Sequence, residues 1–172
     1  MTTNNRERLI AAAAELLHEH PYHAVGVQTL CERAGVRKGS FYHFFQSKEE
    51  LTIAAVERAW AAYKHGLAEL PLEGQTIEKR LRLIVDNCLG SPLVYSLDGD
   101  RLVGCPFGRL AASITEEEPE LRDRLAAIFR EWIQLLTDAA GGDTEVAWST
   151  LAEIQGTLLL KATLEPAVVA TP

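Results

Sequence analysis

The chain has 172 residues, of which 47% are hydrophobic and 24% charged, and its net charge is −7. This composition is sufficient for a buried core and excludes an intrinsically disordered protein. Residues 1–50 carry six basic and six acidic side chains, so residues 51–172 hold the whole negative excess. An acidic body disfavours indiscriminate binding to polyanions, whereas a neutral N-terminal part with grouped Arg and Lys still allows a specific, salt-sensitive phosphate contact.

The three cysteines, Cys31, Cys88 and Cys105, form neither a CxxC pair nor an even-numbered framework. This usage fits a reducing compartment and predicts a cytoplasmic protein. The apolar run at residues 9–17 contains Glu15 and is typical of an amphipathic helix, not of a signal peptide. No segment approaches the roughly 18 consecutive apolar residues of a membrane span.

Three helices are expected in the N-terminal part. The first covers residues 9–17 and ends before Pro21, since its apolar residues repeat with helical spacing. The second ends at Gly35, a residue suited to the left-handed conformation that closes a helix, after which Val36 can pack inward. Its apolar face consists of Val27, Leu30, Cys31 and Ala34, and the face of the third helix consists of Phe41, Phe44 and Phe45.

Two short helices around a glycine turn predict a helix-turn-helix, although a solvated helical hairpin with an aromatic core is the alternative. The second helix of such a unit enters the DNA major groove, which is about 12 Å wide. Lys38, Ser40, Tyr42 and His43 are expected to read bases, and Lys48 is expected to anchor phosphate. The full set of predicted DNA-binding residues is Gln28, Thr29, Arg37, Lys38, Ser40, Tyr42, His43 and Lys48.

A longer helix follows. Ser47 and Glu50 have the spacing of a capping box, so a fourth helix should begin there and continue to about Ala62. Residues 70–74 are typical of a connector, and a fifth helix is expected from about Thr76 to Cys88. Residues 90–108, with four glycines and two prolines, predict an irregular segment.

Two apolar helices are expected at the C-terminal end. One starts at Pro119 and ends at Gly141 and Gly142, and Glu116 to Glu118 precede it, where negative charge suits the helix dipole. The other is capped by Thr144, with its apolar face at residues 147, 151, 154 and 158. This antiparallel pair is either the core of its own domain or a surface for a second copy of the chain.

The middle of the chain contains material for a ligand pocket. Trp60, Tyr63, Phe107 and Trp132, together with Cys105, are predicted to line a mostly apolar pocket, with ordinary core packing as the alternative. Cys105 directly precedes an expected helix that carries Arg109. It is therefore either a thiolate-forming sensor of electrophiles or a buried structural thiol.

Motifs for catalysis and metal binding are missing. The sequence contains no G-x-S-x-G, H-E-x-x-H or G-x-G-x-x-G motif, and residues 35–40 lack the spacing of a phosphate loop. His18, His20 and His23 have no acidic or thiol partner at a supporting spacing. We therefore expect no enzyme activity, no metal and no cofactor.

Residues 34–51, AGVRKGSFYHFFQSKEEL, resemble the TetR/AcrR family of transcriptional regulators in their A-G-V-x-K-G-[ST]-[FL]-Y-x-[HY]-F-x-[ST]-K-E-x-L pattern, within a match over residues 4–66. The resemblance implies an all-α fold, with a three-helix helix-turn-helix DNA-binding domain at residues 1–50 and a helical ligand-binding and dimerisation domain at residues 51–172. Residues 104–111 are similar to a G-C-P/L-x-G-N-L-A stretch of some TetR-like electrophile sensors, with Arg109 where asparagine is usual.

The resemblance further implies a homodimeric repressor that uses its two C-terminal helices as the dimer interface. Such a repressor binds a near-palindromic operator and is released by a small molecule or an electrophile. Two other functions remain open, a DNA-binding activator without a small-molecule ligand and a helical protein-interaction module.

Overall fold

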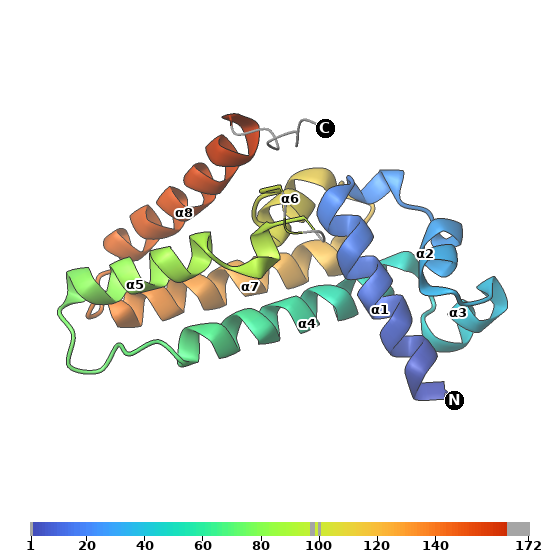
Figure 1. The fold of residues 1–172 in the computed structure, drawn as a ribbon, viewed down its shortest axis with the longest axis horizontal. Coiled ribbons are helices and arrows are strands. Elements are labelled where there is room, and N and C mark those ends of the chain that lie inside the picture. Colours follow the sequence, from blue (N-terminus) through green and yellow to red (C-terminus); the bar gives the residue numbers. More distant parts are fainter. Residues whose placement is uncertain (1, 97–98, 100, 165–172) are drawn as a thin grey trace, which may run out of the picture. The chain divides into compact units, whose positions relative to one another are not determined.

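The computed structural model describes residues 2–96, 99 and 101–164 (Figure 1). Its α-helices are α1 (Thr2–Glu19), α2 (Val27–Ala34), α3 (Lys38–Phe44), α4 (Lys48–Ala68), α5 (Ile77–Leu89), α6 (Pro106–Ser113), α7 (Pro119–Ala139) and α8 (Thr144–Leu164). Two short 3-10 helices, η1 (Tyr22–Ala24) and η2 (Pro92–Val94), lie in the connections. The all-α prediction is confirmed, and within the described residues an isolated antiparallel bridge, Tyr95 to Leu102, is the one pairing of extended segments.

Close contacts divide the chain into two compact units. Unit 1 contains the chain up to Ala61 together with Pro106–Leu125, and unit 2 contains Ala62–Cys105 and the chain from Ala126 onward. These units cut α4 and α7, and they differ from the boundary predicted after residue 50, which remains a prediction about domain organisation.

In unit 1, the glycine turn between α2 and α3 has the expected geometry. Gly35 adopts the left-handed conformation with φ 60° and ψ 39°, and the Val36 amide donates to the Cys31 carbonyl at 2.9 Å. Val36 is buried beneath this turn, as predicted. Gly35 is needed here because the left-handed region is unfavourable for residues with a Cβ.

The aromatic face expected for the third helix is buried only in part. Phe41 is fully buried and Phe45 is 2% exposed, but Phe44 is half-buried. The reason is that α3 ends at Phe44, and Phe45 follows in an extended conformation that turns its ring inward. The interior of unit 1 also receives Leu9, Leu30 and other apolar side chains from α1 and α2, namely Ile10, Ala12, Ala13, Cys31 and Ala34.

The helix starts confirm one of the two predicted caps, at Ser47, and show a further cap at Thr76. Ser47 Oγ accepts the Glu50 amide at 3.0 Å, and Thr76 Oγ1 accepts the Lys79 amide at 3.3 Å. The prediction that Thr144 caps the last helix is wrong, because Asp143 Oδ1 accepts the Val146 amide at 3.0 Å and Thr144 is already helical. Asp and Thr are both common N-cap residues, so the sequence alone does not tell which of the adjacent residues Asp143 and Thr144 caps the helix.

Unit 2 is a small helical assembly in which α5 packs against α8 (Figure 1). Its core side chains come from α5, α7 and α8 and include Ile84, Cys88, Trp132, Leu136, Ile154 and Leu158. An ion pair between Lys64 and Glu131, at 3.2 Å, joins α4 to α7 on the surface of this unit. None of the helices in the described part of the chain has the length and apolar character needed to cross a membrane.

Candidate nucleic-acid interface

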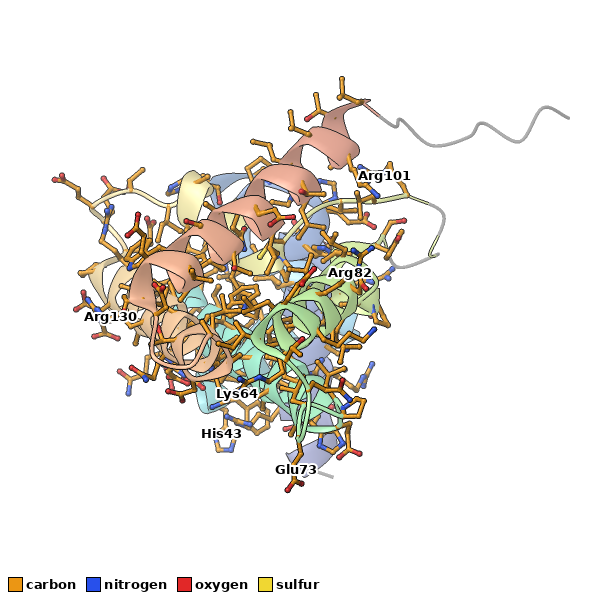
Figure 2. All side chains as sticks on the ribbon, turned by 90° about the vertical axis from the view of Figure 1, so that its left-hand side faces the viewer. His43, Lys64, Glu73, Arg82, Arg101 and Arg130 are labelled. Atoms are coloured by element: carbon orange, nitrogen blue, oxygen red, sulfur yellow. The ribbon has the colours of Figure 1, made fainter. Side chains whose placement is uncertain are left out.

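The second helix of the helix-turn-helix, α3, presents a polar, solvent-exposed face. Arg37, Lys38, Tyr42 and His43 are exposed, with Tyr42 at 56%, while Phe41 on the opposite face is fully buried. Figure 2 shows the His43 side chain directed outward. Ser40 is half-buried. One face of α3 is thus packed against unit 1, and the other face presents several hydrogen-bond donors to solvent.

The cations of this face differ from those elsewhere in unit 1. Arg33 pairs with Glu15 at 2.7 Å, and Arg6 and Arg58 both pair with Glu7. Within the described residues, neither Arg37 nor Lys38 lies within ion-pair distance of a carboxylate. Their charge is therefore available to an external anion, whereas the charges of Arg6, Arg33 and Arg58 are partly neutralised by carboxylates.

Gln28 and Thr29, the predicted contacts at the start of α2, are both exposed. The Gln28 amide already donates to Glu32 Oε1 at 2.7 Å on the same helix. This bond is on the surface, where water competes for both groups, so it leaves Gln28 able to exchange partners at little cost.

Lys48 has an internal role that the sequence did not reveal. Its Nζ donates to the carbonyls of Tyr22 and Val25 at 3.1 and 3.2 Å and lies 3.7 Å from the centre of the Tyr22 ring. Burial lowers the pKa of Lys48, and the charge of Glu118 partly opposes this effect. The phosphate contact of Lys48 stays a prediction, since these internal contacts already use two of the three donors of its ammonium.

The predicted ligand-binding residues are divided between the two compact units. Trp60 and Phe107 pack edge to face at 5.7 Å within unit 1, and both are fully or almost fully buried. Tyr63, Cys105 and Trp132 belong to unit 2. The Tyr63 and Trp132 rings lie 4.7 Å apart within unit 2.

Tyr63 is the centre of a buried polar group in unit 2. Its hydroxyl is hydrogen-bonded to Cys88 Sγ, and Cys105 Sγ accepts the Gln155 amide at 3.4 Å. Burial is the main cause that raises the pKa of Tyr63, and burial also raises the pKa of Cys88 to about 12. Cys88 is therefore a protonated, unreactive thiol at neutral pH.

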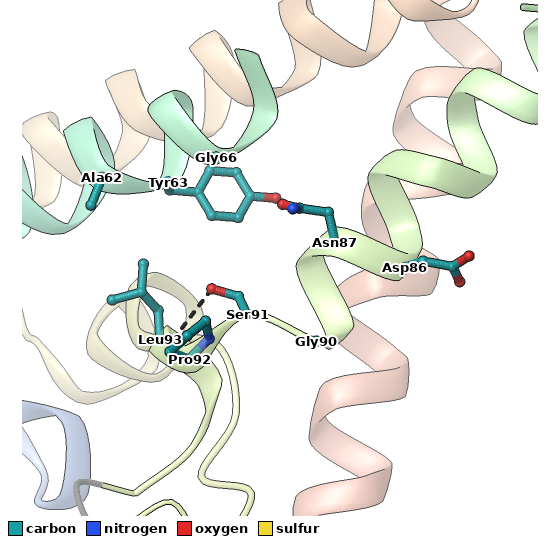
Figure 3. Close-up of a pocket in the computed structure, with 9 residues that line it drawn as sticks. All are labelled: Ala62, Tyr63, Gly66, Asp86, Asn87, Gly90, Ser91, Pro92 and Leu93. Carbon is teal, nitrogen blue, oxygen red and sulfur yellow. Dashed lines mark hydrogen bonds between the residues drawn. The ribbon is translucent and has the colours of Figure 1, made fainter. Parts of the chain in front are cut away.

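A cavity of about 450 Å³ opens beside Tyr63 in unit 2 (Figure 3). The Tyr63 phenol points toward the Asn87 side chain, and Ser91 Oγ accepts the Leu93 amide at 3.3 Å. The lining residues are Ala62, Tyr63, Gly66, Asp86, Asn87, Gly90, Ser91, Pro92 and Leu93. Of the predicted ligand residues, only Tyr63 belongs to this set. The others were missed because glycine, serine and proline after a helix carry no pattern that distinguishes a cavity wall from a turn.

Comparison with known proteins agrees with this geometry. Residues 9–55 match the family model of bacterial regulatory proteins of the tetR family. The chain is 30% identical to the HTH-type transcriptional repressor NemR of Escherichia coli K12 over 137 residues, which cover 79% of this chain and 67% of NemR.

Two solved structures show the same likeness in three dimensions. A crystal structure of E. coli NemR in its reduced form superposes with a TM-score of 0.72 and 26% identity, covering 94% of this chain and 89% of that one. The regulatory protein TetR from Rhodobacter sphaeroides gives a TM-score of 0.75 and 26% identity, covering 92% and 88%.

A helix-turn-helix with an exposed polar second helix defines a DNA-binding transcription regulator. With the sequence and structural likeness above, the chain belongs to the TetR family of bacterial regulatory proteins. The predicted family resemblance is confirmed.

The substitution Lys48→Met is expected to destabilise unit 1 by about 1–3 kcal/mol, because it keeps the apolar stem but removes the donor to two carbonyls and the charge over Tyr22. Urea unfolding followed by circular dichroism measures this cost. The matched control is Lys38→Met on the exposed face of α3, expected to change stability by no more than about 0.5 kcal/mol. Equal unfolding midpoints for the two variants would contradict the internal role of Lys48.

Proposed function

We propose that this protein is a ligand-responsive transcriptional repressor that binds a near-palindromic operator as a homodimer. The observation that carries the proposal is the exposed face of α3, where Arg37 and Lys38 lie beside Tyr42 and His43 and have no carboxylate of the described residues within ion-pair distance. Arginine and lysine supply the phosphate attraction, and the donors along the helix supply base contacts in the major groove. Ser40, Gln28 and Thr29 complete the proposed interface, and Lys48 contributes its remaining donor to phosphate. Location in the cytoplasm belongs to the same proposal.

DNA binding is tested with a duplex that the wild-type protein selects from a random-sequence pool. Arg37→Ala is expected to weaken binding to selected and random duplexes alike and to reduce the slope of log affinity against log salt by about 1. Tyr42→Ala is expected to cost about tenfold on the selected duplex.

The control for these two variants is Lys64→Ala, which removes an exposed cation of unit 2 that is paired with Glu131. It is expected to bind both duplexes like wild type. If Arg37→Ala and Tyr42→Ala also bind like wild type, α3 is not the reading helix.

The dimer is supported by an unusually apolar exposed surface on α8. Trp148 is 59% exposed and Leu159 67%, and Ala152 and Gly156, which lie between them on the same helical face, carry no charge. An exposed apolar helix face of this extent is typical of a protein interface. TetR-family regulators bind DNA as dimers, and two reading helices about 34–36 Å apart match successive major grooves. We therefore assign this face of α8 to a second copy of the chain.

Sedimentation velocity tests the interface. Leu159→Glu buries a carboxylate in the proposed contact and is expected to convert the dimer to a monomer at micromolar concentration. Lys161→Glu places a carboxylate on the same helical turn but outside this face and is expected to remain dimeric. A dimeric Leu159→Glu protein would place the interface elsewhere.

The effector is proposed to act on unit 2. Tyr63 lines the cavity of this unit, and its hydroxyl is hydrogen-bonded to the buried thiol of Cys88. Cys105 is the candidate nucleophile, because it directly precedes the first residue of α6 and the other thiol of this unit, Cys88, has a raised pKa. The Cys105 Sγ accepts a hydrogen bond from the Gln155 amide, and the residue is only 5% exposed. Modification of the thiol therefore requires unit 2 to open or this hydrogen bond to break. A crystal structure of NemR is described as its reduced form, and we propose that the thiol state of Cys105 controls DNA binding by this chain.

Alkylation with N-ethylmaleimide tests the sensor. Modified wild-type protein is expected to lose at least about tenfold in affinity for the selected duplex, while Cys105→Ser keeps its affinity after the same treatment. Cys31→Ser, in which a buried thiol of unit 1 is removed, is the control and should still be released. Equal release of Cys105→Ser would refute Cys105 as the sensor.

The other functions predict different results in these experiments. A DNA-binding activator without an effector would select a duplex but would not be released by alkylation. A protein-interaction module would select no duplex at all. The exposed face of α3 favours DNA binding over a protein-interaction module. Arg37 and Lys38 are exposed cations, which an apolar protein contact does not use.

A further inference from the structure

One carboxylate of unit 1 is buried although its neighbours in the sequence are not. Glu118 is 7% exposed at the start of α7, while Glu116 and Glu117 are exposed. Favourable charge at a helix start explains the two exposed residues, as expected from the sequence, but it does not require burial. A buried charge is costly unless it is paired or hydrogen-bonded, so the partners of Glu118 show what its burial achieves.

These partners come from both sides of the helix-turn-helix. Glu118 Oε2 accepts the amide and the hydroxyl of Thr115, at 2.9 and 3.2 Å, and lies 3.7 Å from His23 Nε2. Its charge also acts on Lys48, whose ammonium holds the carbonyls of Tyr22 and Val25. The carboxylate therefore faces η1 on one side and the first turn of α4 on the other.

Two further hydrogen bonds join the same segments. The Leu121 amide, in the first turn of α7, donates to Glu49 Oε1 at 2.9 Å, and the Tyr22 amide donates to Ser113 Oγ at 3.3 Å. Residues 22–25 precede α2 and residues 48–49 follow α3. The segment 113–121 thus holds both ends of the helix-turn-helix, and all of these groups belong to unit 1.

We propose that Glu118 is a positioning residue for DNA recognition: its carboxylate, through His23 and Lys48, fixes the orientation of the α2–α3 pair on the segment 113–121. This inference rests on the proposed DNA-binding function. Glu118 lies outside the reading helix and touches no base, so it acts by holding the residues that do. A helix that must present several side chains to base edges loses specific contacts when its support loosens, whereas the phosphate attraction of its cations survives.

The ionisation of Glu118 agrees with this arrangement. Burial alone would raise its pKa, but the two hydrogen bonds from Thr115 and the charges of His23 and Lys48 outweigh it, so the pKa of Glu118 lies below its usual value. The charged form is consequently favoured by folding. Its contribution to stability is complete above the ordinary glutamate range near 4.5 and is lost as the pH falls through the lower value of the folded state. The other titratable groups that face this site from the neighbouring elements are His23, Lys48, Glu49 and the Tyr22 phenol.

The substitution Glu118→Gln separates charge from hydrogen bonding, because the amide oxygen can still accept from Thr115 while the attraction to His23 and Lys48 disappears. Its affinity for the duplex selected by the wild-type protein is expected to fall about tenfold, with less than about a twofold change for random duplex. Glu117→Gln, one residue away and exposed, makes the same change in net charge and is expected to stay within about twofold on both.

Thermal unfolding between pH 7 and pH 3 gives a second readout. Wild-type protein is expected to lose more stability toward pH 3 than Glu118→Gln, and Glu117→Gln is expected to follow wild type. Circular dichroism confirms that each variant is folded. If Glu118→Gln does not fold, His23→Gln carries the test, since His23 is largely on the surface, and it is expected to lose about two- to fivefold on the selected duplex alone.

The outcomes separate this inference from the proposed function. A wild-type protein that selects no duplex overturns the DNA-binding function, and the role of Glu118 falls with it. A wild-type protein that selects a duplex, together with Glu118→Gln or His23→Gln binding as Glu117→Gln does, overturns the positioning role alone. A parallel loss on selected and random duplexes also overturns it, because it would show a loss of phosphate attraction.

Discussion

The ammonium of Lys48 is the interaction on which unit 1 depends. It stands at the start of α4, yet its partners are the carbonyls of Tyr22 and Val25 and the face of the Tyr22 ring, all before α2. The helix-turn-helix is a short excursion of the chain between these points, too small to bury a core by itself. Lys48 ties together the two ends of this segment, whose helices have only eight and seven residues and pack against α1.

The charged side chains of unit 1 fall into two groups, those used inside the fold, as Lys48 is, and those left exposed. Lys48, Glu49 and Glu118 are used between elements, where partial burial strengthens each contact. Arg37 and Lys38 are left on the free face of α3. The net negative charge of this protein repels DNA, and few cations are available to attract the phosphates. Affinity therefore depends on holding those cations in the orientation that contacts the phosphates.

The division of the chain gives α6 and the start of α7 a distinctive position. They lie in unit 1, although the residues before Pro106 and after Leu125 belong to unit 2. Cys105 is thus the last residue of unit 2 before the chain enters the segment that holds the helix-turn-helix. The proposed sensor and the proposed positioning residue are thirteen residues apart in the sequence, so chemistry at the thiol has a short covalent path to the support of the reading helix.

Much of this protein is determined by local sequence. Apolar spacing, the left-handed Gly35 and the caps at Ser47 and Thr76 specify helices through contacts within a few residues, and the exposed face of α3 follows from the burial of Phe41. Tertiary structure alone decided that Lys48 binds carbonyls more than twenty residues away, that Glu118 is buried while Glu117 is not, and that Trp60 packs on Phe107 while Tyr63 packs on Trp132. These outcomes depend on which distant groups meet, and residue type and spacing carry no information about long-range partners.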